Sequence, residues 1–361
     1  MQPLAFGSYR NWRHLVRESG GVDPSFRRRA AFVTAVSLAT APLRVADRLG
    51  RRDRVVPDGV PPPLFVVGHW RSGTTYLHNL LCEDPQFGFV TAFQTLAPEA
   101  TRVGRGSLRP LMAWRMPPTR VVDEMAQSID GPIEEEWAMA NMSPYSPYHH
   151  FTFPRRFGHF MRYALMVDVP PHEVRAWQSL YASVVARATA LAPGRRLVLK
   201  NPANTGRLPA LLALFPEALV VHIVRSPYDV FASTLRLYDT LYGIAAMHPV
   251  PRAEVEENIL SSYAAIQGKF LADRETLGAG RLVEVRYEDL AAAPLEVLGR
   301  VYEALVLPGF GRAEPHLRRH AEATARHVVR THGAPPALAA RVRERWRFAF
   351  EAWRYPENGA P

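Results

Sequence analysis

The sequence predicts an α/β fold, a parallel β-sheet flanked by helices, with helical extensions at both ends of the chain. Short apolar runs of β type at residues 64–67, 197–199, 219–224 and 281–285 alternate with stretches of helical patterning. A glycine-containing loop lies between the first run and the helix that follows it. With 361 residues, 47% of them hydrophobic, the chain can bury a large core, which excludes a disordered or collagen-like protein.

The elements follow one another in a simple order. Residues 1–56 have a helical and basic pattern, and we expect an N-terminal extension that is joined to the rest by the proline-rich residues 57–63. Residues 57–361 are predicted to form a single α/β domain, because no later linker divides them. Helices are expected at 74–82 and about 172–192, between the later strands, and over the charged last 50 residues. Since strands alternate with helices, the sheet should be parallel and covered on both faces.

Residues 85–160 have no clear period and are rich in aromatic residues, methionine and proline, which is typical of an insertion or lid. An adaptable apolar wall of this kind would suit a hydrophobic ligand, but the same side chains could equally fill a core. The residues concerned are Met139, Met142, Tyr145, Tyr148, Phe151, Phe153, Phe157 and Phe160.

The basic residues are almost all arginine. Lys and Arg total 44, the net charge is +10, and only Lys200 and Lys269 are lysines. Such a surplus points to anionic partners such as phosphate, sulfate, nucleic acid or acidic lipid, although genomic base composition can produce the same ratio.

Two features concern the compartment. Cys82 is the only cysteine and no signal-peptide pattern is present, so we expect a cytoplasmic protein. The longest apolar stretch, residues 30–43, is too short to span a bilayer and has arginines on both sides. Two interpretations stay open: an amphipathic helix packed on the domain, or a peripheral membrane contact through residues 27–54.

The strongest motif is the loop at residues 68–75, GHWRSGTT, between the first strand and its helix. Backbone N–H groups of such a loop and the start of the helix can surround an oxyanion. The spacing is that of a nucleotide triphosphate loop, but Thr74 stands where that loop has its lysine. No strand ends in an aspartate that could hold Mg²⁺, and the third ends in Arg225. The pattern therefore argues against ATP or GTP hydrolysis and favours a metal-free anion site.

The G-x-x-R-S-G-T-T loop resembles the 5′-phosphosulfate loop of sulfotransferases that use 3′-phosphoadenosine 5′-phosphosulfate (PAPS). A second segment, VHIVRSPYDVFAS at residues 221–233, resembles the 3′-phosphate segment of this family. The runs L-K-N-P at 199–202 and V-R-Y-E-D-L at 285–290 extend the likeness. The resemblance implies an α/β fold, PAPS as co-substrate and no metal. It assigns the co-substrate to Gly68, Arg71, Ser72, Gly73, Thr74, Thr75, Arg225 and Ser233.

The start of the helix after the third strand has its own signals. Ser226 is a good N-cap, Pro227 suits the first helical position, and Asp229 could close a capping box. This places Ser233 two turns into the helix, and whether it meets Arg225 depends on the fold.

Sulfuryl transfer builds negative charge on the oxygen that leaves with the nucleotide. Arg71 can hold two oxygens of the phosphosulfate with its planar fork, and Lys200 at the end of the second strand can place a compact charge at the leaving oxygen. The alternative for Lys200 is a charge at a strand end that extends into solvent.

The base that accepts the acceptor's proton is less clear. In the cytosolic enzymes of the family a His lies two residues after the corresponding Lys, but here that residue is Pro202, and the Glu of the tyrosylprotein enzymes has no counterpart at residues 89–93. If a helix begins at Pro132, Glu136 and Glu134 flank its apolar face and Glu135 points away. Burial would raise the pKa of such a carboxylate, as a base requires. We expect Glu136 first and Glu134 second, against a solvated acidic helix end. The rival bases are His69, His149 and His150.

Together these features predict a PAPS-dependent sulfotransferase acting on a hydroxyl of a hydrophobic small molecule or lipid. The alternatives are a kinase or NTPase of the phosphate-loop type and a basic module that binds membrane or nucleic acid. The oligomeric state stays open. A cluster near the C-terminus could close over the 3′-phosphate, but its signal is weak in so arginine-rich a chain. It consists of Arg318, Arg319, Arg326 and Arg330.

Overall fold

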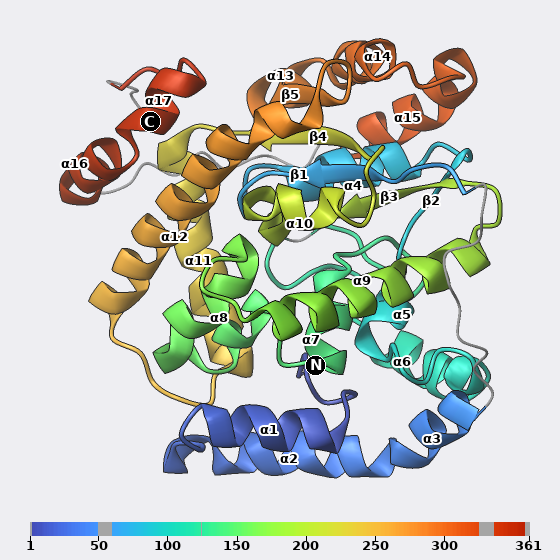
Figure 1. Ribbon diagram of the computed structural model, residues 1–361, viewed down its shortest axis with the longest axis vertical. Coiled ribbons are helices and arrows are strands. Elements are labelled where there is room, and N and C mark those ends of the chain that lie inside the picture. The colour runs from blue at the N-terminus through green and yellow to red at the C-terminus, as the bar shows by residue number, and fades with distance from the viewer. Residues whose placement is uncertain (1, 50–59, 124, 325–335, 358–361) are drawn as a thin grey trace.

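Five parallel strands form the centre of the computed structural model, which describes residues 2–49, 60–123, 125–324 and 336–357 (Figure 1). The sheet has the order β2-β3-β1-β4-β5, so β1 lies between β3 and β4. The predicted α/β fold with a parallel sheet is confirmed. The strands are β1 (Leu64–Val67), β2 (Phe87–Gly88), β3 (Arg196–Lys200), β4 (Leu219–Val224) and β5 (Leu282–Arg286).

Side chains of β1 alternate between two cores, one on each face of the sheet. Phe65 and Val67 belong to the larger core, and Leu64 and Val66 belong to the smaller one. All four are fully buried, which is why the strand reads as a continuous apolar run. The same pattern predicted β3, β4 and β5 to within a residue or two. β2 was missed because two residues carry no period.

Helices cover both faces of the sheet. The smaller core is closed by α4 (Thr74–Cys82), α13 (Tyr287–Ala292), α14 (Pro294–Ala304) and α15 (Phe310–Thr324). The larger core is closed by α9 (Pro171–Leu191), α10 (Leu208–Leu212), α11 (Pro227–Ala245) and α12 (Arg252–Asp273), with the 3₁₀ turns η5 (Pro202–Gly206) and η6 (Arg274–Leu277). The helices predicted at 74–82 and 172–192 are therefore present.

Residues 85–160 form several short elements after β2. These are α5 (Ala92–Leu96), η2 (Val103–Arg105), α6 (Leu108–Arg115), α7 (Glu136–Met142), η3 (Pro147–Phe151) and η4 (Pro154–Arg156), followed by α8 (Phe157–Leu165). Most of the aromatic residues singled out in the sequence, together with Met139, are buried in the larger core, while Met142 and Tyr145 pack against it partly buried. The core interpretation of these side chains therefore holds over that of a ligand-facing wall.

The N-terminal extension is helical through residue 49, and residues 50–56 lie outside the described part. It contains α1 (Tyr9–Glu18), η1 (Pro24–Phe26), α2 (Arg27–Ala39) and α3 (Ala41–Leu49). The Trp12 ring stacks on Phe153 with centroids 5.9 Å apart, and Asn11 Nδ2 donates to the Ala140 carbonyl at 3.0 Å. In the described residues, Pro24–Leu49 is one helical segment long and apolar enough to cross a membrane by length and composition alone. This corrects the expectation from residues 30–43, because the helical run continues beyond the apolar stretch.

The C-terminal helices α16 (Pro336–Arg345) and α17 (Arg347–Ala352) lie beside α12 (Figure 1). Trp346 anchors them, because its ring stacks on Tyr263 at 3.7 Å and its Nε1 donates to the Leu260 carbonyl at 2.9 Å. The predicted helical character of this end of the chain is thus observed.

Candidate active site

The loop between β1 and α4 turns sharply, through backbone conformations that residues other than glycine rarely adopt. Gly68, Arg71 and Gly73 have positive φ angles of 142°, 70° and 99°. A side chain on Gly68 would have its Cβ 2.3 Å from the Ile223 carbonyl oxygen, so only glycine fits there. The Ser72 hydroxyl donates to the His69 carbonyl at 2.7 Å and closes the turn. The loop has the strand and helix on either side that an oxyanion cradle requires.

Gly73 is held against the segment that carries the R-Y-E-D-L run. A Cβ on Gly73 would lie 2.2 Å from Cδ2 of the Tyr287 ring. The Arg225 guanidinium also lies over the Tyr287 ring, 4.7 Å from its centroid. The first strand's loop and the ends of β4 and β5 thus meet at one place.

The residues assigned to the donor nucleotide converge at this edge of the sheet. Arg71 Nε donates to the Ser233 hydroxyl at 2.8 Å, and Arg225 Nη1 lies 3.4 Å from the Arg71 carbonyl oxygen. Asp123 pairs with Arg71 at 3.0 Å and lies 3.5 Å from Arg120. Burial lowers the pKa of the Arg71 guanidinium, and the neighbouring Arg120 and Arg225 add to this. The three arginines here face two carboxylates, Asp123 and Asp229, which leaves a surplus of positive charge.

The predicted capping box at the start of α11 is wrong. The Ser226 side chain makes no cap hydrogen bond, and its backbone N–H donates instead to Glu288 Oε1 at 2.9 Å. Asp229 is in the first turn of α11, but its carboxylate lies 3.7 Å from the Arg225 guanidinium. A carboxylate 62 residues further along the chain thus satisfies the helix N-terminus and leaves Asp229 to orient Arg225.

Lys200 ends β3 and points into the protein. It is 1% exposed, forms an ion pair with Glu134 Oε1, and its Nζ lies 3.3 Å from Thr75 Oγ1 in the loop. The interpretation of Lys200 as a charge extending into solvent is therefore wrong. Burial lowers the pKa of the Lys200 ammonium, and Glu134 acts in the opposite direction. Arg120 Nη1 also donates to Thr75 Oγ1, at 3.1 Å.

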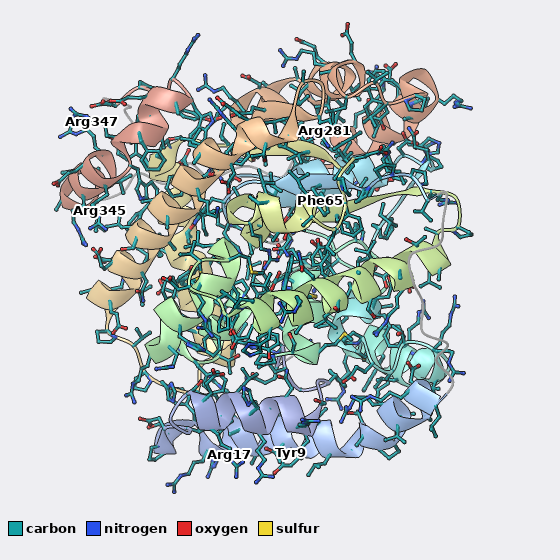
Figure 2. All side chains as sticks on the ribbon, in the orientation of Figure 1. Tyr9, Arg17, Phe65, Arg281, Arg345 and Arg347 are labelled. Atoms are coloured by element: carbon teal, nitrogen blue, oxygen red, sulfur yellow. The ribbon has the colours of Figure 1, made fainter. Side chains whose placement is uncertain are left out.

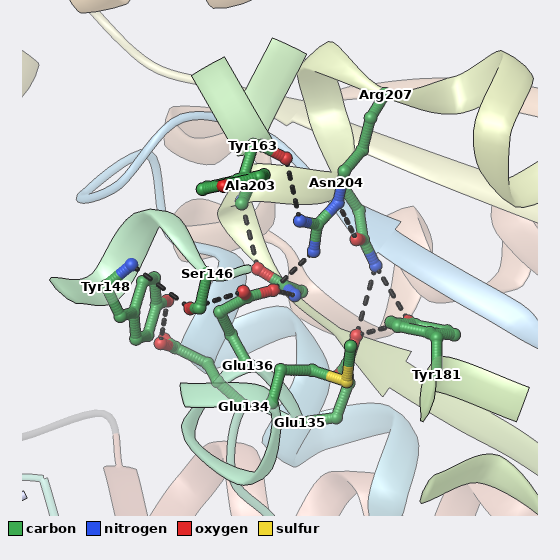
Figure 3. A network of polar contacts seen from close by, with 12 residues as sticks. Glu134, Glu135, Glu136, Ser146, Tyr148, Tyr163, Tyr181, Ala203, Asn204 and Arg207 are labelled. Atoms are coloured by element: carbon green, nitrogen blue, oxygen red, sulfur yellow. Dashed lines mark hydrogen bonds and ion pairs between the residues drawn. The ribbon is translucent and has the colours of Figure 1, made fainter. Parts of the chain in front are cut away.

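Glu134 joins Lys200 to an aromatic hydroxyl. Its Oε2 accepts a hydrogen bond from the Tyr148 hydroxyl (Figure 3). Burial alone would raise the pKa of Glu134, but the charges of Lys200 and Arg120 hold it below its usual value. The raised pKa expected for a buried carboxylate in this segment is thus not found at Glu134.

Glu136 lies in a different and closed environment. It forms an ion pair with Arg207, with both side chains 0% exposed, and accepts hydrogen bonds at 2.6 Å from the Ser146 hydroxyl and from Asn201 Nδ2. Figure 3 shows the side chains of Glu136, Ser146 and Arg207 turned toward one another. Both carboxylate oxygens of Glu136 accept hydrogen bonds from the protein, so Glu136 links α7 to Ser146, Asn201 and Arg207.

Glu135 also differs from expectation. Helix α7 begins at Glu136 and not at Pro132, so the helical spacing that turned Glu135 outward does not apply. Glu135 is fully buried, and its Oε1 accepts from the Tyr181 hydroxyl at 2.6 Å and from Asn204 Nδ2 at 3.0 Å. Burial raises its pKa. The interpretation of residues 134–136 as a solvated acidic helix end is therefore wrong.

The three histidines considered as bases are all fully buried. Burial lowers the pKa of His69 and His150 to about 3 and that of His149 to about 4, so all three are neutral near pH 7. His149 Nε2 lies 2.8 Å from the Ser143 carbonyl oxygen and His69 Nδ1 lies 3.0 Å from the Trp70 carbonyl oxygen. These contacts are with backbone and place the rings in the core.

The C-terminal arginines are only partly described. Arg318 and Arg319 are on α15 and bond to Glu314 at 2.7 Å and to His316 at 2.8 Å within the same helix. Arg326 and Arg330 lie outside the described residues. Over the described part of the chain, no three His, Cys, Asp or Glu side chains come together as a metal site.

Arg120, Asp123 and Arg207 were missed by sequence reasoning. Arg120 and Asp123 lie in a segment without a period, and Arg207 is one arginine among 42 in the sequence. Nothing in the run K-N-P-A-N-T-G-R at residues 200–207 distinguishes Arg207, because its partner Glu136 lies 71 residues earlier in the chain.

Comparison with known proteins identifies the chain. A model of the sulfotransferase family matches residues 62–311, a range that includes the loop at residues 68–75, Arg225 after β4 and Arg286 at the end of β5. The chain belongs to the sulfotransferase family. It is therefore an enzyme, and the kinase and nucleic-acid alternatives are set aside.

Two curated sulfotransferases are similar over almost the whole chain. The omega-hydroxy-beta-dihydromenaquinone-9 sulfotransferases of Mycobacterium bovis and Mycobacterium tuberculosis are each 30% identical over 99% of this chain and 92% of their own length. Among solved structures, sulfotransferase STF9 from Mycobacterium avium has a TM-score of 0.68 at 17% identity, covering 98% of both chains. Sulfotransferase STF1 from Mycobacterium tuberculosis has a TM-score of 0.63 at 20% identity, covering 93% of this chain and 92% of its own. These structures share the fold.

Substitution of Gly73 tests the loop geometry of this sulfotransferase. In Gly73→Ala the new methyl group would clash with Tyr287, and its positive φ adds strain, so we expect affinity for adenosine 3′,5′-bisphosphate to fall by about tenfold or more. Calorimetric titration with adenosine 3′,5′-bisphosphate measures this affinity. Gly194→Ala is the matched control, because Gly194 has φ +73° with nothing within 4 Å of its added Cβ. Equal affinity of the two variants would contradict the close fit of the loop.

Removal of the Glu136 charge tests the closed ion pair. Glu136→Gln leaves the Arg207 charge buried without its partner, so the free energy of unfolding should fall by about 3–5 kcal/mol in urea denaturation. Glu314→Gln, which breaks the exposed pair with Arg318, should change it by less than about 0.5 kcal/mol. A Glu136→Gln protein as stable as the wild type would show that the Arg207 pair does not hold this segment.

Proposed function

We propose that this sulfotransferase moves a sulfuryl group from PAPS to a hydroxyl of a hydrophobic small molecule or lipid, without a metal. The observation that carries the proposal is the meeting of Arg71, Arg225 and Ser233 beside Lys200 at the carboxyl edge of the sheet. The resembling mycobacterial enzymes are named for an omega-hydroxy-dihydromenaquinone acceptor, and this supports a lipid hydroxyl as the acceptor class. A cytoplasmic location, with contact to a membrane surface through residues 27–54, belongs to the same proposal.

The residues present fit the donor. The glycine cradle leaves room that any Cβ would fill, and the arginines around it carry more charge than Asp123 balances. The loop N–H groups, Ser72, Thr74 and Thr75 would face the 5′-phosphosulfate. When the donor binds, its phosphosulfate oxygens would take the place of the Asp123 carboxylate on the Arg71 guanidinium, because the two anions compete for the same N–H donors.

The donor's other end would lie at the end of β4. Arg225 and Ser233 would hold the 3′-phosphate, with Asp229 keeping the Arg225 guanidinium in place. Arg71 touches Ser233 directly, so the two phosphate sites are part of one hydrogen-bonded unit. A nucleotide with phosphates at both the 3′ and 5′ positions suits this spacing of charges.

In the transfer itself, the bond between sulfur and the bridging oxygen breaks while the acceptor oxygen bonds to sulfur from the opposite side. Adenosine 3′,5′-bisphosphate leaves with both electrons of the broken bond. The Lys200 ammonium, held beside Thr75 of the loop, would stabilise the charge that develops on the leaving oxygen.

Glu134 is the carboxylate that we assign to the acceptor's proton, ahead of Glu136. Glu134 borders Lys200 and the loop and keeps 8% of its surface exposed, whereas Glu136 is closed off by Arg207, Asn201 and Ser146. The lowered pKa of Glu134 keeps it ionised near neutrality, but it also makes Glu134 a weaker base than the raised pKa expected from the sequence would have done.

The two lysines give a matched test of the transfer step. Lys200→Ala should lower kcat by about 10²–10³-fold, since it removes the charge at the leaving oxygen, while adenosine 3′,5′-bisphosphate still binds. Lys269, which pairs with Asp273 on α12 at 2.6 Å, is the control, and Lys269→Ala should leave kcat unchanged. Turnover is measured with ³⁵S-labelled PAPS and a hydroxylated lipid quinone. If millimolar bisphosphate gave no calorimetric signal with the wild type, the PAPS proposal would fail.

The base is tested by Glu134→Gln, which keeps an acceptor for the Tyr148 hydroxyl but removes the proton acceptor. We expect kcat to fall by about 10²-fold or more with nucleotide affinity retained. Because the pKa of Glu134 lies below its ordinary value of 4.5, the base form persists as the pH falls, and wild-type kcat/KM should stay level down to about pH 5. An undiminished kcat in Glu134→Gln would exclude Glu134 as the base.

A further inference from the structure

One face of the N-terminal helices α2 and α3 is apolar and exposed. Six residues spaced alternately four and three apart form what we call the apolar stripe, and such spacing keeps them on one side of a helix. Leu38, Val45 and Leu49 in the stripe are 51%, 55% and 85% exposed, and the neighbouring Phe32 is 53% exposed. The members of the stripe are Ala31, Ala35, Leu38, Pro42, Val45 and Leu49.

The opposite face of the same helices holds their polar groups against the protein. The Ser37 hydroxyl donates to the Gly7 carbonyl at 2.8 Å, and Arg44 Nη1 donates to the Thr40 hydroxyl at 2.6 Å. Asp47 Oδ1 accepts from the backbone N–H groups of residues 102 and 103 at 2.9 and 3.1 Å. These bonded polar groups face inward beside the buried Val33, while the exposed side carries the apolar stripe, which an ordinary surface helix does not expose.

Basic side chains surround the stripe. Residues 8–49 contain eight arginines and three carboxylates, and none of these carboxylates is exposed. The exposed row Arg10, Arg13 and Arg17 runs along α1, and Figure 2 places Tyr9 and Arg17 at this edge of the molecule, far from the sheet. Arg28 and Arg48 are exposed near the two ends of the stripe.

We propose that the apolar stripe and its arginines dock the enzyme on an anionic lipid bilayer, with α2 and α3 lying in the plane of the headgroups. Helices that combine an apolar face with arginines bind such surfaces in this way. The inference rests on the lipid acceptor of the proposed function.

A bilayer fits this face better than the two other occupants. A second copy would bring its own arginines against these arginines with no exposed carboxylate in residues 8–49 to pair with them. Insertion across the membrane would strip Arg44 of the Phe6 carbonyl, 3.4 Å away, and Asp47 of the backbone N–H groups of residues 102 and 103, at a large cost in free energy. A helix lying on the surface keeps both sets of contacts.

The docking face is connected to the active site by direct contacts. Asn11 of α1 bonds to the Ala140 carbonyl on α7, the helix that begins at Glu136. Asp47 of α3 holds the turn before α6, which lies beside α3 in Figure 1 and exposes 77% of Trp114. The chain that follows α6 reaches the nucleotide loop through Arg120. A lipid presented at this face would thus lie near elements that form the site.

The test uses the full chain and sedimentation with large unilamellar vesicles. We expect binding to phosphatidylglycerol-containing vesicles, weaker binding to phosphatidylcholine vesicles, and a loss of about a hundredfold in the partition coefficient for Leu38→Glu/Val45→Glu. Leu191→Glu/Val167→Glu is the matched control, since these side chains are 59% and 47% exposed on other elements. This control should bind as the wild type does.

Sedimentation-velocity ultracentrifugation and a water-soluble acceptor complete the design. Absence of wild-type binding to anionic vesicles, equal binding of the two double variants, or a wild-type dimer that Leu38→Glu/Val45→Glu converts to monomer would each overturn the proposal. Turnover of a short-chain hydroxylated acceptor in solution should be the same in the wild type and both variants. Loss of that turnover in the wild type would contradict the proposed function, and it would leave the vesicle result intact.

Discussion

Two ion pairs buried beneath the edge of the sheet, Lys200 with Glu134 and Arg207 with Glu136, are the interactions on which the arrangement of the site depends. Burying a charge is costly unless its partners are close and its remaining oxygens or protons are bonded, and here both carboxylates meet that condition. Loss of either partner would leave a charge without compensation. The end of β3, the turn after it and the segment before α7 therefore have one compatible arrangement, and this arrangement brings Lys200 to Thr75 in the phosphate loop.

The two pairs differ in a way that explains the choice of cation. Arg207 donates to Asn204 and to the Tyr163 carbonyl as well as to Glu136, so its planar fork serves three fixed acceptors in a sealed position. Lys200 has a single rotatable head between a carboxylate and a loop hydroxyl, and it can turn toward a new anion there. In the proposed reaction, one of the two lysines in an arginine-rich chain supplies the compact point charge at the leaving oxygen. In the same proposal, Arg71 and Arg225 hold the anions of the donor, with Arg120 beside them.

Local pattern was enough to predict four of the five strands and most helices, and it singled out the loop at residues 68–75, because each of these depends on neighbours in the sequence. The fates of residues 134–136 could not be predicted, because their partners Tyr148, Tyr181 and Arg207 come from distant elements. A helix beginning at Pro132 was the natural local expectation, and long-range ion pairing overrides it. The start of α11 shows the same limit, since Glu288 accepts the Ser226 backbone N–H that Asp229 was expected to bind.

The N-terminal helices show the same limit in a different form. Sequence spacing alone indicates that α2 and α3 have an apolar stripe, but it does not say which way the stripe faces. The buried Ser37 and Asp47 decide this, because turning the stripe inward would break their hydrogen bonds to Gly7 and to residues 102 and 103 and would expose Val33. The apolar face of α2 and α3 is thus exposed because the hydrogen-bonded polar side chains on their opposite face must stay buried. This exposed apolar surface lies next to arginines that have no exposed carboxylates to pair with. An anionic lipid surface is complementary to both features, because it offers apolar chains and negatively charged headgroups.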